Sequence, residues 1–320
     1  VTAFAPTVIG VVIQFISWPF AYLGTVLAAV ITLWLGAKVK YTQTRPQAAP
    51  FDYMGGVLVL LAVALVTTGI MQGGVDGLTS PAVLLLVAAG LAAGAILVVV
   101  SLRKQHPLIQ FRLLTIRNVA IAVFVTLMRF LPNVLMGAFV ARYAQQVLGL
   151  SPTVTGLLMI LPILAQVVAA PVAGKLLDKI GPRTPVALGM ALLLGGLVLL
   201  AFGFPAQNIW VVLLGTIVGG AGFAFTNPVQ IAALNQTPLE QRGMAAGIFP
   251  LAGQFGTALW VALLTAGLSA MMAQNAAAGE AAAQAQALGT LSWISAGVTL
   301  VTLLAALLLR SAPAPSEPRP

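Results

Sequence analysis

The chain has 320 residues, of which 60% are hydrophobic and only 7% are charged, whereas soluble domains usually carry about a quarter charged residues. Its mean hydropathy is +1.05. This composition excludes a water-soluble enzyme, a nucleic-acid-binding domain and a disordered protein, because too few charges are present to cover a surface in water. It indicates a chain that folds in a lipid bilayer.

Ten apolar runs, each near the length of about 20 residues that crosses a bilayer, predict membrane-spanning helices. The runs are apolar on all sides, as expected for helices in lipid, and lack the alternation of membrane barrel strands. The sequence therefore predicts an all-α fold, a polytopic transmembrane helical bundle. The predicted spans are Thr2–Ser17, Phe20–Leu35, Tyr53–Met71, Pro81–Leu102, Val119–Ala141, Thr153–Gly174, Pro185–Phe204, Ile209–Ala233, Met244–Met272 and Leu288–Leu309.

The basic residues of the chain segregate between the two sides of this predicted bundle. Successive spans alternate in direction, which places every Lys and Arg except Arg129 and Arg142 on one side. Because cytoplasmic loops carry the excess of Lys and Arg, we expect a multi-pass protein of the inner (plasma) membrane with both ends of the chain cytoplasmic. The net charge of +9 is then an orientation signal, and no nucleic-acid partner is expected.

Arg129 is a charged residue near the middle of a predicted span, where insertion costs about 2.5–3.5 kcal/mol. Asn133 follows one turn later on the same face, and Pro132 should free backbone carbonyls and kink the helix. A cationic site in a water-filled path would bind an anionic group or pair with an acid from elsewhere. The alternative is a misplaced span boundary, with an arginine that snorkels to the interface.

Polar amides inside other spans are further candidates for lining a path. Such amides also hydrogen-bond between helices, and the sequence leaves both roles open. Glycine pairs with the small-xxx-small spacing predict close approach of helices. The amides are Gln166, Asn227, Gln230 and Gln254, and the glycine pairs are Gly90 with Gly94 and Gly215 with Gly219. The chain has no cysteine and one histidine, and it has no metal-protease motif or nucleophile–base set, so neither an enzyme nor a metal site is expected.

A charged turn between two spans is the most informative local feature, and it reads G-K-L-L-D-K-I-G-P-R from Gly174 to Arg183. We expect Gly174 to allow a tight helix exit and Gly181 to allow a turn and restart. Asp178 is flanked by basic residues and can accept charge-assisted hydrogen bonds or cap a neighbouring helix. The predicted conformational latch consists of Gly174, Lys175, Asp178, Lys179, Gly181 and Arg183. A topogenic basic loop is the alternative.

At this turn the sequence resembles the major facilitator superfamily, whose cytoplasmic motif reads roughly G-x-L-a-D-r-x-G-r-k. Three more stretches are similar to its fourteen-helix drug/proton antiporter family: 143–162, 106–113 and 242–247. They match the patterns YLQ-x-VLG-x-SP-x-x-x-G-x-x-x-LP, HPL-x-x-L-R-L and RG-x-A-x-G. Pro6 and Gly10 resemble a degraded form of the antiporter motif G-P-x-x-x-G-G.

The resemblance implies six helices, two extra central helices and six more helices. Residues 1–37 would then be the last two helices of the N-terminal half, and 38–117 a linker with the two central helices and a basic cytoplasmic segment. Residues 118–310 would be the six-helix C-terminal half, followed by a disordered tail at 311–320. About four N-terminal helices would be absent, so we expect the chain to be a C-terminal portion whose partner is the missing N-terminal half.

The resemblance further implies a proton-coupled multidrug efflux antiporter that works by alternating access. Its partners would be the lipid bilayer and an amphipathic small-molecule substrate, with no cofactor beyond the proton gradient. Two alternatives remain open: an exporter or importer of an anionic metabolite that uses Arg129, and a truncated membrane subunit that does not transport.

Overall fold

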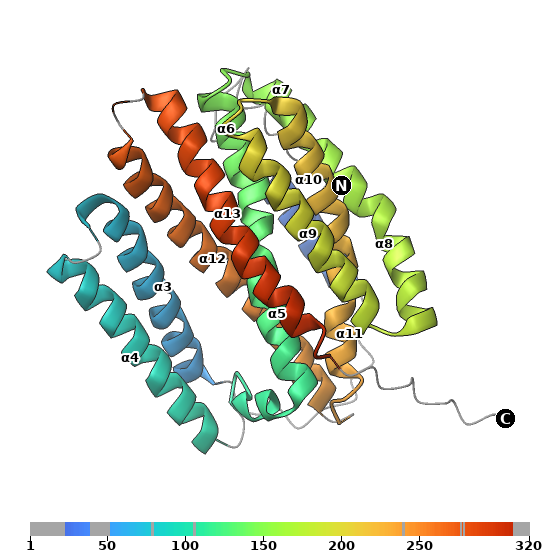
Figure 1. Ribbon diagram of the computed structural model, residues 1–320. Coiled ribbons are helices and arrows are strands. Elements are labelled where there is room, and N and C mark those ends of the chain that lie inside the picture. Colours follow the sequence, from blue (N-terminus) through green and yellow to red (C-terminus); the bar gives the residue numbers. More distant parts are fainter. Residues whose placement is uncertain are drawn as a thin grey trace.

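The computed structural model describes residues 23–38, 52–77, 80–104, 107–238, 241–275, 277 and 279–309. In this part of the chain the regular elements are helical and no strand occurs, which confirms the predicted all-α fold (Figure 1). The elements are α2 (Leu23–Lys38), α3 (Tyr53–Asp76), α4 (Pro81–Arg103), the 3₁₀-helix η3 (Phe111–Thr115), α5 (Arg117–Val134), the π-helix η4 (Leu135–Phe139), α6 (Val140–Gln146), α7 (Pro152–Leu158), α8 (Ile160–Ile180), α9 (Arg183–Gly203), α10 (Ile209–Thr226), α11 (Pro228–Leu234), α12 (Arg242–Gln274) and α13 (Glu280–Ala306).

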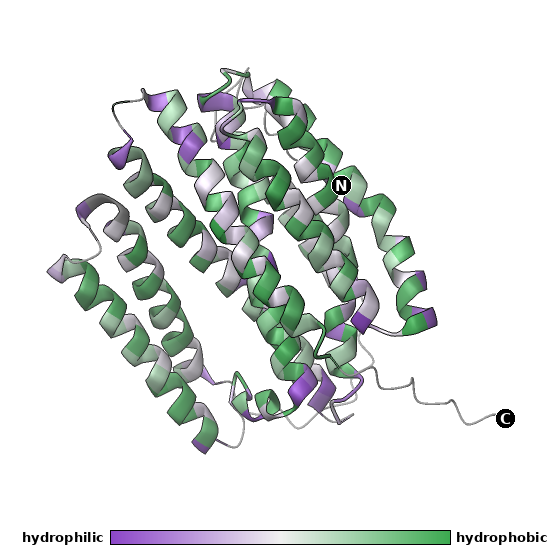
Figure 2. Ribbon diagram, viewed as in Figure 1, coloured by the Kyte–Doolittle hydropathy of each residue, from purple (hydrophilic) through white to green (hydrophobic). Residues whose placement is uncertain are grey.

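Within the described residues, eight helical stretches are long and apolar enough to cross a bilayer. Each overlaps one of the last eight predicted spans, although the last begins at Glu280, before the predicted start at Leu288. The first predicted span lies outside the described residues, and the second is described from Leu23 onward as α2, which is not among the eight. Figure 2 shows apolar residues along the lengths of these helices and hydrophilic residues near their ends. The stretches are Tyr53–Gly73, Pro81–Arg103, Arg117–Gln146, Pro152–Ile180, Arg183–Gly203, Ile209–Leu234, Arg242–Gln274 and Glu280–Ala306.

The helix α8 extends past the predicted end of its span. It continues to Ile180, so the expectation that Gly174 ends the helix is wrong. Charged residues such as Lys175 end a hydrophobic run, but they are good helix formers and do not end a helix. The helix ends instead at Gly181, whose φ of 76° suits glycine, and whose N–H donates to the Leu177 carbonyl.

The core of the molecule lies among the helices from α5 to α13. Helix α9 packs against α10 and α13, and α5 packs against α12 and α13. In the most apolar stretch of each helix, half of the residues of α9 and α13 are buried, compared with 11% in α3 and 22% in α4. The six-span C-terminal bundle therefore supplies the buried core, and the central pair α3 and α4 lies at its side (Figure 1).

Glycines allow the closest approaches between helices. A Cβ atom at Gly196 of α9 would lie 2.6 Å from the Gly215 carbonyl oxygen of α10, and one at Gly219 would collide with a methionine side chain. A Cβ at Gly90 of α4 would lie 2.8 Å from a backbone nitrogen of α3, whereas Gly94 has room for one. The close packing predicted from the glycine pairs is confirmed at Gly215, Gly219 and Gly90, but not at Gly94.

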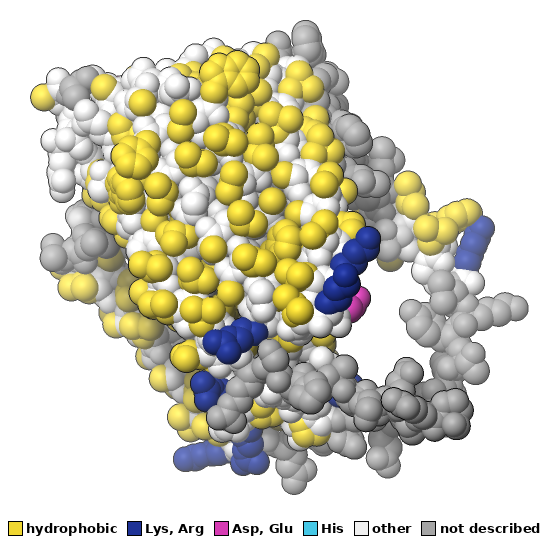
Figure 3. All heavy atoms as spheres, turned by 45° about the vertical axis from the view of Figure 1, so that its right-hand side comes forward, with side chains coloured by type: hydrophobic (Ala, Val, Ile, Leu, Met, Phe, Trp, Pro, Cys, Tyr) yellow, Lys and Arg dark blue, Asp and Glu magenta, His cyan; other side chains and the backbone are white. Residues whose placement is uncertain are grey.

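Basic side chains gather at one end of the bundle, where α4, α8 and α13 end and α5, α9 and α12 begin. The face in Figure 3 is covered by hydrophobic side chains, and no Lys or Arg interrupts its upper part. The predicted segregation of charge is therefore present among the described residues, with Arg142 near the opposite end. This basic end holds Arg103, Lys104, Arg112, Arg117, Lys175, Lys179, Arg183 and Arg242.

Candidate functional site

Arg129 lies inside the bundle, on α5, with only 4% of its surface exposed. Its Nη1 atom donates to Thr226 Oγ1 and to Asn227 Oδ1, each at 2.8 Å. The guanidinium also lies over the Phe223 ring, 4.7 Å from its centroid, a favourable cation–π geometry. Arg129 is thus held by the end of α10, and the alternative that it snorkels to the interface is wrong.

The charge of Arg129 has no acidic partner in the part of the chain that the structure describes. The ion pair between Lys104 and Asp52 is the only one found there, and the Nε atom of Arg129 is buried without a hydrogen-bond partner. Buried charges in proteins are normally paired. Arg129 therefore has a buried donor at Nε and an unneutralised charge available for an anionic group.

The backbone beside Arg129 departs from a regular α-helix. Pro132 lies inside α5 and lacks an N–H group, and the chain changes to the π-helix η4 at Leu135. On the facing helix, Pro228 begins α11 directly after Asn227. Such proline positions and π-turns interrupt backbone hydrogen bonding and recur at functional sites. The helix type thus changes directly after Pro132, and a kink at this proline stays a prediction.

A cavity of about 360 Å³ opens beside the π-helix, between α5, α8 and α10. Most of its wall is apolar, with three polar side chains: Asn133, Gln166 and Thr216. Phe223 lines the same cavity and also contacts the Arg129 guanidinium. We call this the polar cavity. Its size and its few convergent polar groups are typical of a small-molecule site.

The structure brings together some of the predicted path residues and separates others. Asn133 and Gln166 both line the polar cavity. Asn227 accepts a hydrogen bond from Arg129, which lies on α5 one turn before Asn133. Gln230 lies half-buried on α11 and lines neither this cavity nor the next. Gln254 lies on α12 and lines a different cavity, beside α3 and α4.

Sequence reasoning missed Thr226, Phe223 and Thr216. The first two hold the guanidinium from α10, and Thr216 lines the polar cavity. A hydroxyl and an aromatic ring within one turn of the predicted path residue Asn227 were a usable signal. Threonine and phenylalanine are common in membrane helices, however, and only the position of the facing Arg129 distinguishes these two.

The predicted latch lies at the end of α8 and the start of α9. Asp178 is exposed and makes no ion pair within the described residues, so a latch at this turn stays a prediction. Gly181 and Pro182 form the tight turn between the two helices, and Arg183 is the first residue of α9. Pro6 and Gly10, the remnant of the antiporter motif, lie outside the described residues.

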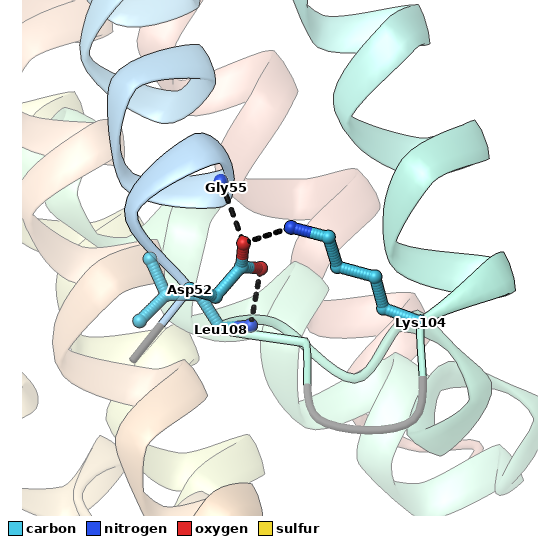
Figure 4. A network of polar contacts seen from close by, with 4 residues as sticks. All are labelled: Asp52, Gly55, Lys104 and Leu108. Atoms are coloured by element: carbon cyan, nitrogen blue, oxygen red, sulfur yellow. Dashed lines mark hydrogen bonds and ion pairs between the residues drawn. The ribbon is translucent and has the colours of Figure 1, made fainter. Parts of the chain in front are cut away.

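A second charged site, missed from the sequence, holds the central helices at the basic end (Figure 4). Asp52 precedes α3, and its Oδ1 accepts from the Gly55 N–H at 2.9 Å and from Lys104 Nζ at 2.5 Å. Its Oδ2 accepts from the Leu108 N–H at 3.0 Å. The hydrogen bond from Lys104, followed by those from Leu108 and Gly55, lowers the pKa of Asp52 to about 2. This Asp52 bracket joins α3, the end of α4 and the segment before η3.

Comparison with known protein families assigns this architecture. Residues 119–320 match the model of the Major Facilitator Superfamily. The chain belongs to this superfamily. The superfamily consists of membrane transporters, so the chain is a multi-pass membrane protein and not an enzyme, as the sequence predicted.

Two relatives among curated proteins are resistance proteins. The multidrug resistance protein Stp of Mycobacterium tuberculosis is 27% identical over 273 residues, which cover 85% of this chain and 50% of Stp. The quinolone resistance protein NorB of Staphylococcus aureus is 28% identical over 262 residues, covering 79% of this chain and 56% of NorB. The chain thus spans about half the length of these curated relatives.

A solved structure shares the fold. The nucleoside transporter NupG (D323A mutant) superposes with a TM-score of 0.52 at 16% identity, covering 96% of this chain and 87% of NupG. At this identity the likeness supports the fold and carries no information on substrate.

Proposed function

We propose that the protein exports amphipathic small molecules across the inner membrane in exchange for protons, by alternating access. The basic end of the bundle faces the cytoplasm in this proposal. The observation that carries it is the polar cavity, whose wall is mostly apolar but includes the amides of Asn133 and Gln166 on facing helices. Such a lining suits a compound that is mostly apolar but has a polar group. The resistance relatives Stp and NorB support the same substrate class.

In this proposal Asn133 and Gln166 contact the substrate, and Phe223 transmits its position to Arg129. The guanidinium of Arg129 holds the end of α10 through Thr226 and Asn227. Movement of α10 during alternating access would break these two hydrogen bonds. The turn from Gly174 to Arg183 would latch α8 and α9 in another conformation, in which Asp178 finds a partner.

A second candidate, transport of an anionic metabolite, is favoured by Arg129 itself. Its Nε atom is a buried donor without a partner, and its charge has no carboxylate among the described residues. A substrate carboxylate or phosphate would satisfy both. This candidate predicts that Arg129 binds substrate directly, whereas in drug export it positions α10.

The test uses the full-length protein in proteoliposomes loaded with ethidium, with and without an imposed proton gradient. We expect gradient-driven ethidium movement, and we expect Gln166→Leu to slow it about two- to tenfold, the effect of one lost hydrogen bond. Gln286→Leu is the matched control, because this exposed amide on α13 lies away from the cavity. Ethidium that stays in the vesicles under both conditions contradicts drug export, and gradient-driven uptake of an organic anion in its place supports the second candidate.

A further inference from the structure

A second cavity, larger than the polar cavity, lies between the central helix pair and the bundle, beside the contact of α3 with α12. It has a volume of about 630 Å³ and lies between α3 and α4 on one side and α5 and α12 on the other. Its wall is apolar, with Val63, Leu97, Leu127 and Phe255 among the side chains that face it. We call it the lateral cavity.

The lateral cavity reaches the basic end of the helices. Gln110, Phe111 and Leu114, at and around η3, form that part of its wall. The η3 residue Arg112 is exposed and donates from Nη2 to the Leu102 carbonyl of α4 at 3.3 Å. Its guanidinium therefore lies between two elements that line the cavity.

Near the end of the lateral cavity that η3 lines, positive charges outnumber negative ones among the described residues. Lys104 is neutralised by Asp52, but the neighbouring Arg103 is exposed and forms no ion pair within the described residues. Arg103, at the end of α4, and Arg112, on η3, thus carry two positive charges without an ionic partner in the described structure, beside the end of the cavity that η3 lines. The only acid described near this end of the cavity is Asp52, which is already paired with Lys104.

We propose that the lateral cavity binds one anionic phospholipid, with an acyl chain in the cavity and its phosphate at Arg103 and Arg112. Water does not fill this space, because a buried water needs two to four polar partners and the wall is almost wholly apolar. An empty space of this size would forfeit the dispersion contacts of its lining. Acyl chains are present at this depth, and basic pockets between membrane helices bind anionic head groups.

Gln254 distinguishes a lipid in the lateral cavity from a polar, drug-like occupant. Its amide lines the lateral cavity and forms no hydrogen bond within the described residues. A polar, drug-like occupant would bond this amide, and Gln254→Leu would weaken its binding. An acyl chain gains nothing from the amide, so Gln254→Leu should leave lipid binding unchanged or tighter.

Trp260 offers a reporter at the cavity. Its Nε1 donates to the Leu127 carbonyl at 2.9 Å, and Leu127 lines the lateral cavity. The full-length protein with Trp260 as its single tryptophan is placed in nanodiscs of phosphatidylcholine containing a small fraction of lipid brominated at mid-chain. The measurement is the quenching of Trp260 by brominated phosphatidylglycerol compared with brominated phosphatidylcholine. In this chain the other tryptophans, changed to Phe, are Trp18, Trp34, Trp210 and Trp293.

We expect the anionic lipid to quench Trp260 at several-fold lower concentration than the zwitterionic lipid. Arg103→Gln and Arg112→Gln should each reduce this preference about fivefold, whereas Arg142→Gln at the opposite end should not. Gly94→Leu should remove the preferential quenching by filling the cavity, because the nearest atom to its Cβ is 3.9 Å away. Gly195→Leu, at an open glycine of α9, is the matched control.

Equal quenching by the two lipids in the parent protein would overturn the proposal. So would preferential quenching that survives Gly94→Leu, since the lipid would then bind elsewhere. Loss of lipid binding in Gln254→Leu, with no effect of either arginine change, would identify a polar occupant instead. Because quenching does not depend on transport, failure of this proposal and failure of drug export remain distinguishable.

Discussion

The C-terminal bundle and the central helix pair are both built from apolar helices long enough to cross a bilayer, but they are held together differently. In the bundle, α9 and α10 meet at glycines, and a buried guanidinium joins α5 to α10. The central pair packs within itself at Gly90 and against α12. At one end it is also held by the Asp52 bracket and by the hydrogen bond from Arg112 of η3 to the Leu102 carbonyl. A cavity of about 630 Å³ lies beside it.

Mean hydropathy alone therefore does not tell a helix of the bundle, such as α9, from a helix packed at its side, such as α3. In the bundle, Arg129 and Asn133 lie in the middle of a membrane-length helix, where polar groups are costly, and in the proposed function a substrate reaches them there. In the central pair, the charged groups lie at the membrane surface, where they position helices. We therefore expect mutations in the bundle to change transport and those in the pair to change attachment.

The largest effect on transport is expected for Arg129→Gln. Removing the charge-assisted hydrogen bonds to Thr226 and Asn227, worth about 1.5–3 kcal/mol, should slow transport about tenfold to a hundredfold while insertion is unchanged. Arg129→Lys, which keeps the charge but not the forked donors, should be intermediate. The rate of ethidium movement in proteoliposomes measures this, and full activity in Arg129→Gln would remove Arg129 from the mechanism.

The next largest effect is expected on the stability of the bundle. Gly196→Ala places a methyl group against the Gly215 carbonyl, and such overpacking costs about 1–3 kcal/mol. Gly195→Ala, at the adjacent position, has open space and should be neutral or stabilising. Thermal denaturation of the purified protein checks the pair of variants. Equal midpoints would show that α9 and α10 are not in close contact there.

Loss of the Asp52 bracket should loosen the central pair alone. In Asp52→Asn we expect amide hydrogen exchange in α3 and α4 to rise about tenfold or more, with the bundle unchanged. Asp76→Asn is the control, because Asp76 is an exposed residue at the other end of α3. Exchange that rises equally in α9 and α10 would contradict the separation of the two regions.

The same bracket should respond to acid. Its folded-state pKa of about 2 lies below the ordinary value of 3.8. The stabilisation by Asp52 is therefore complete above about pH 4 and is lost as the pH falls toward 2. Exchange in α3 and α4 should rise over this interval in the parent protein, and less so in Asp52→Asn.

The smallest effect on stability is expected for Asp178→Asn, because Asp178 is exposed and has no ion pair in the described structure. If the turn acts as a latch in another conformation, this variant should slow transport while the denaturation midpoint is unchanged. A lowered midpoint with normal transport would assign Asp178 a structural role in the described conformation.

The sequence predicted the helical class, eight described spans and the separation of charge, because hydropathy and Lys/Arg position depend on the bilayer. It also singled out Arg129, since a charge at mid-span has few explanations. It did not predict the helix end at Gly181, because hydrophobic runs stop at Lys175 while backbone hydrogen bonding continues. Nor did it place Gln166 and Gln254 in different cavities, or pair Asp52 with Lys104, since these depend on packing between distant helices.

The central claim is that the polar cavity is part of a path for amphipathic substrates. Because this chain has no cysteine, a single cysteine at Ala138, on the cavity wall, can report access from water. The measurement is the rate of maleimide labelling of Ala138→Cys in vesicles, with and without ethidium and a proton gradient, with Ala92→Cys on α4 as control. The account predicts labelling at Ala138→Cys that ethidium slows and the gradient alters. A labelling rate at Ala138→Cys that neither ethidium nor the gradient changes, or that equals the rate at Ala92→Cys, would contradict it.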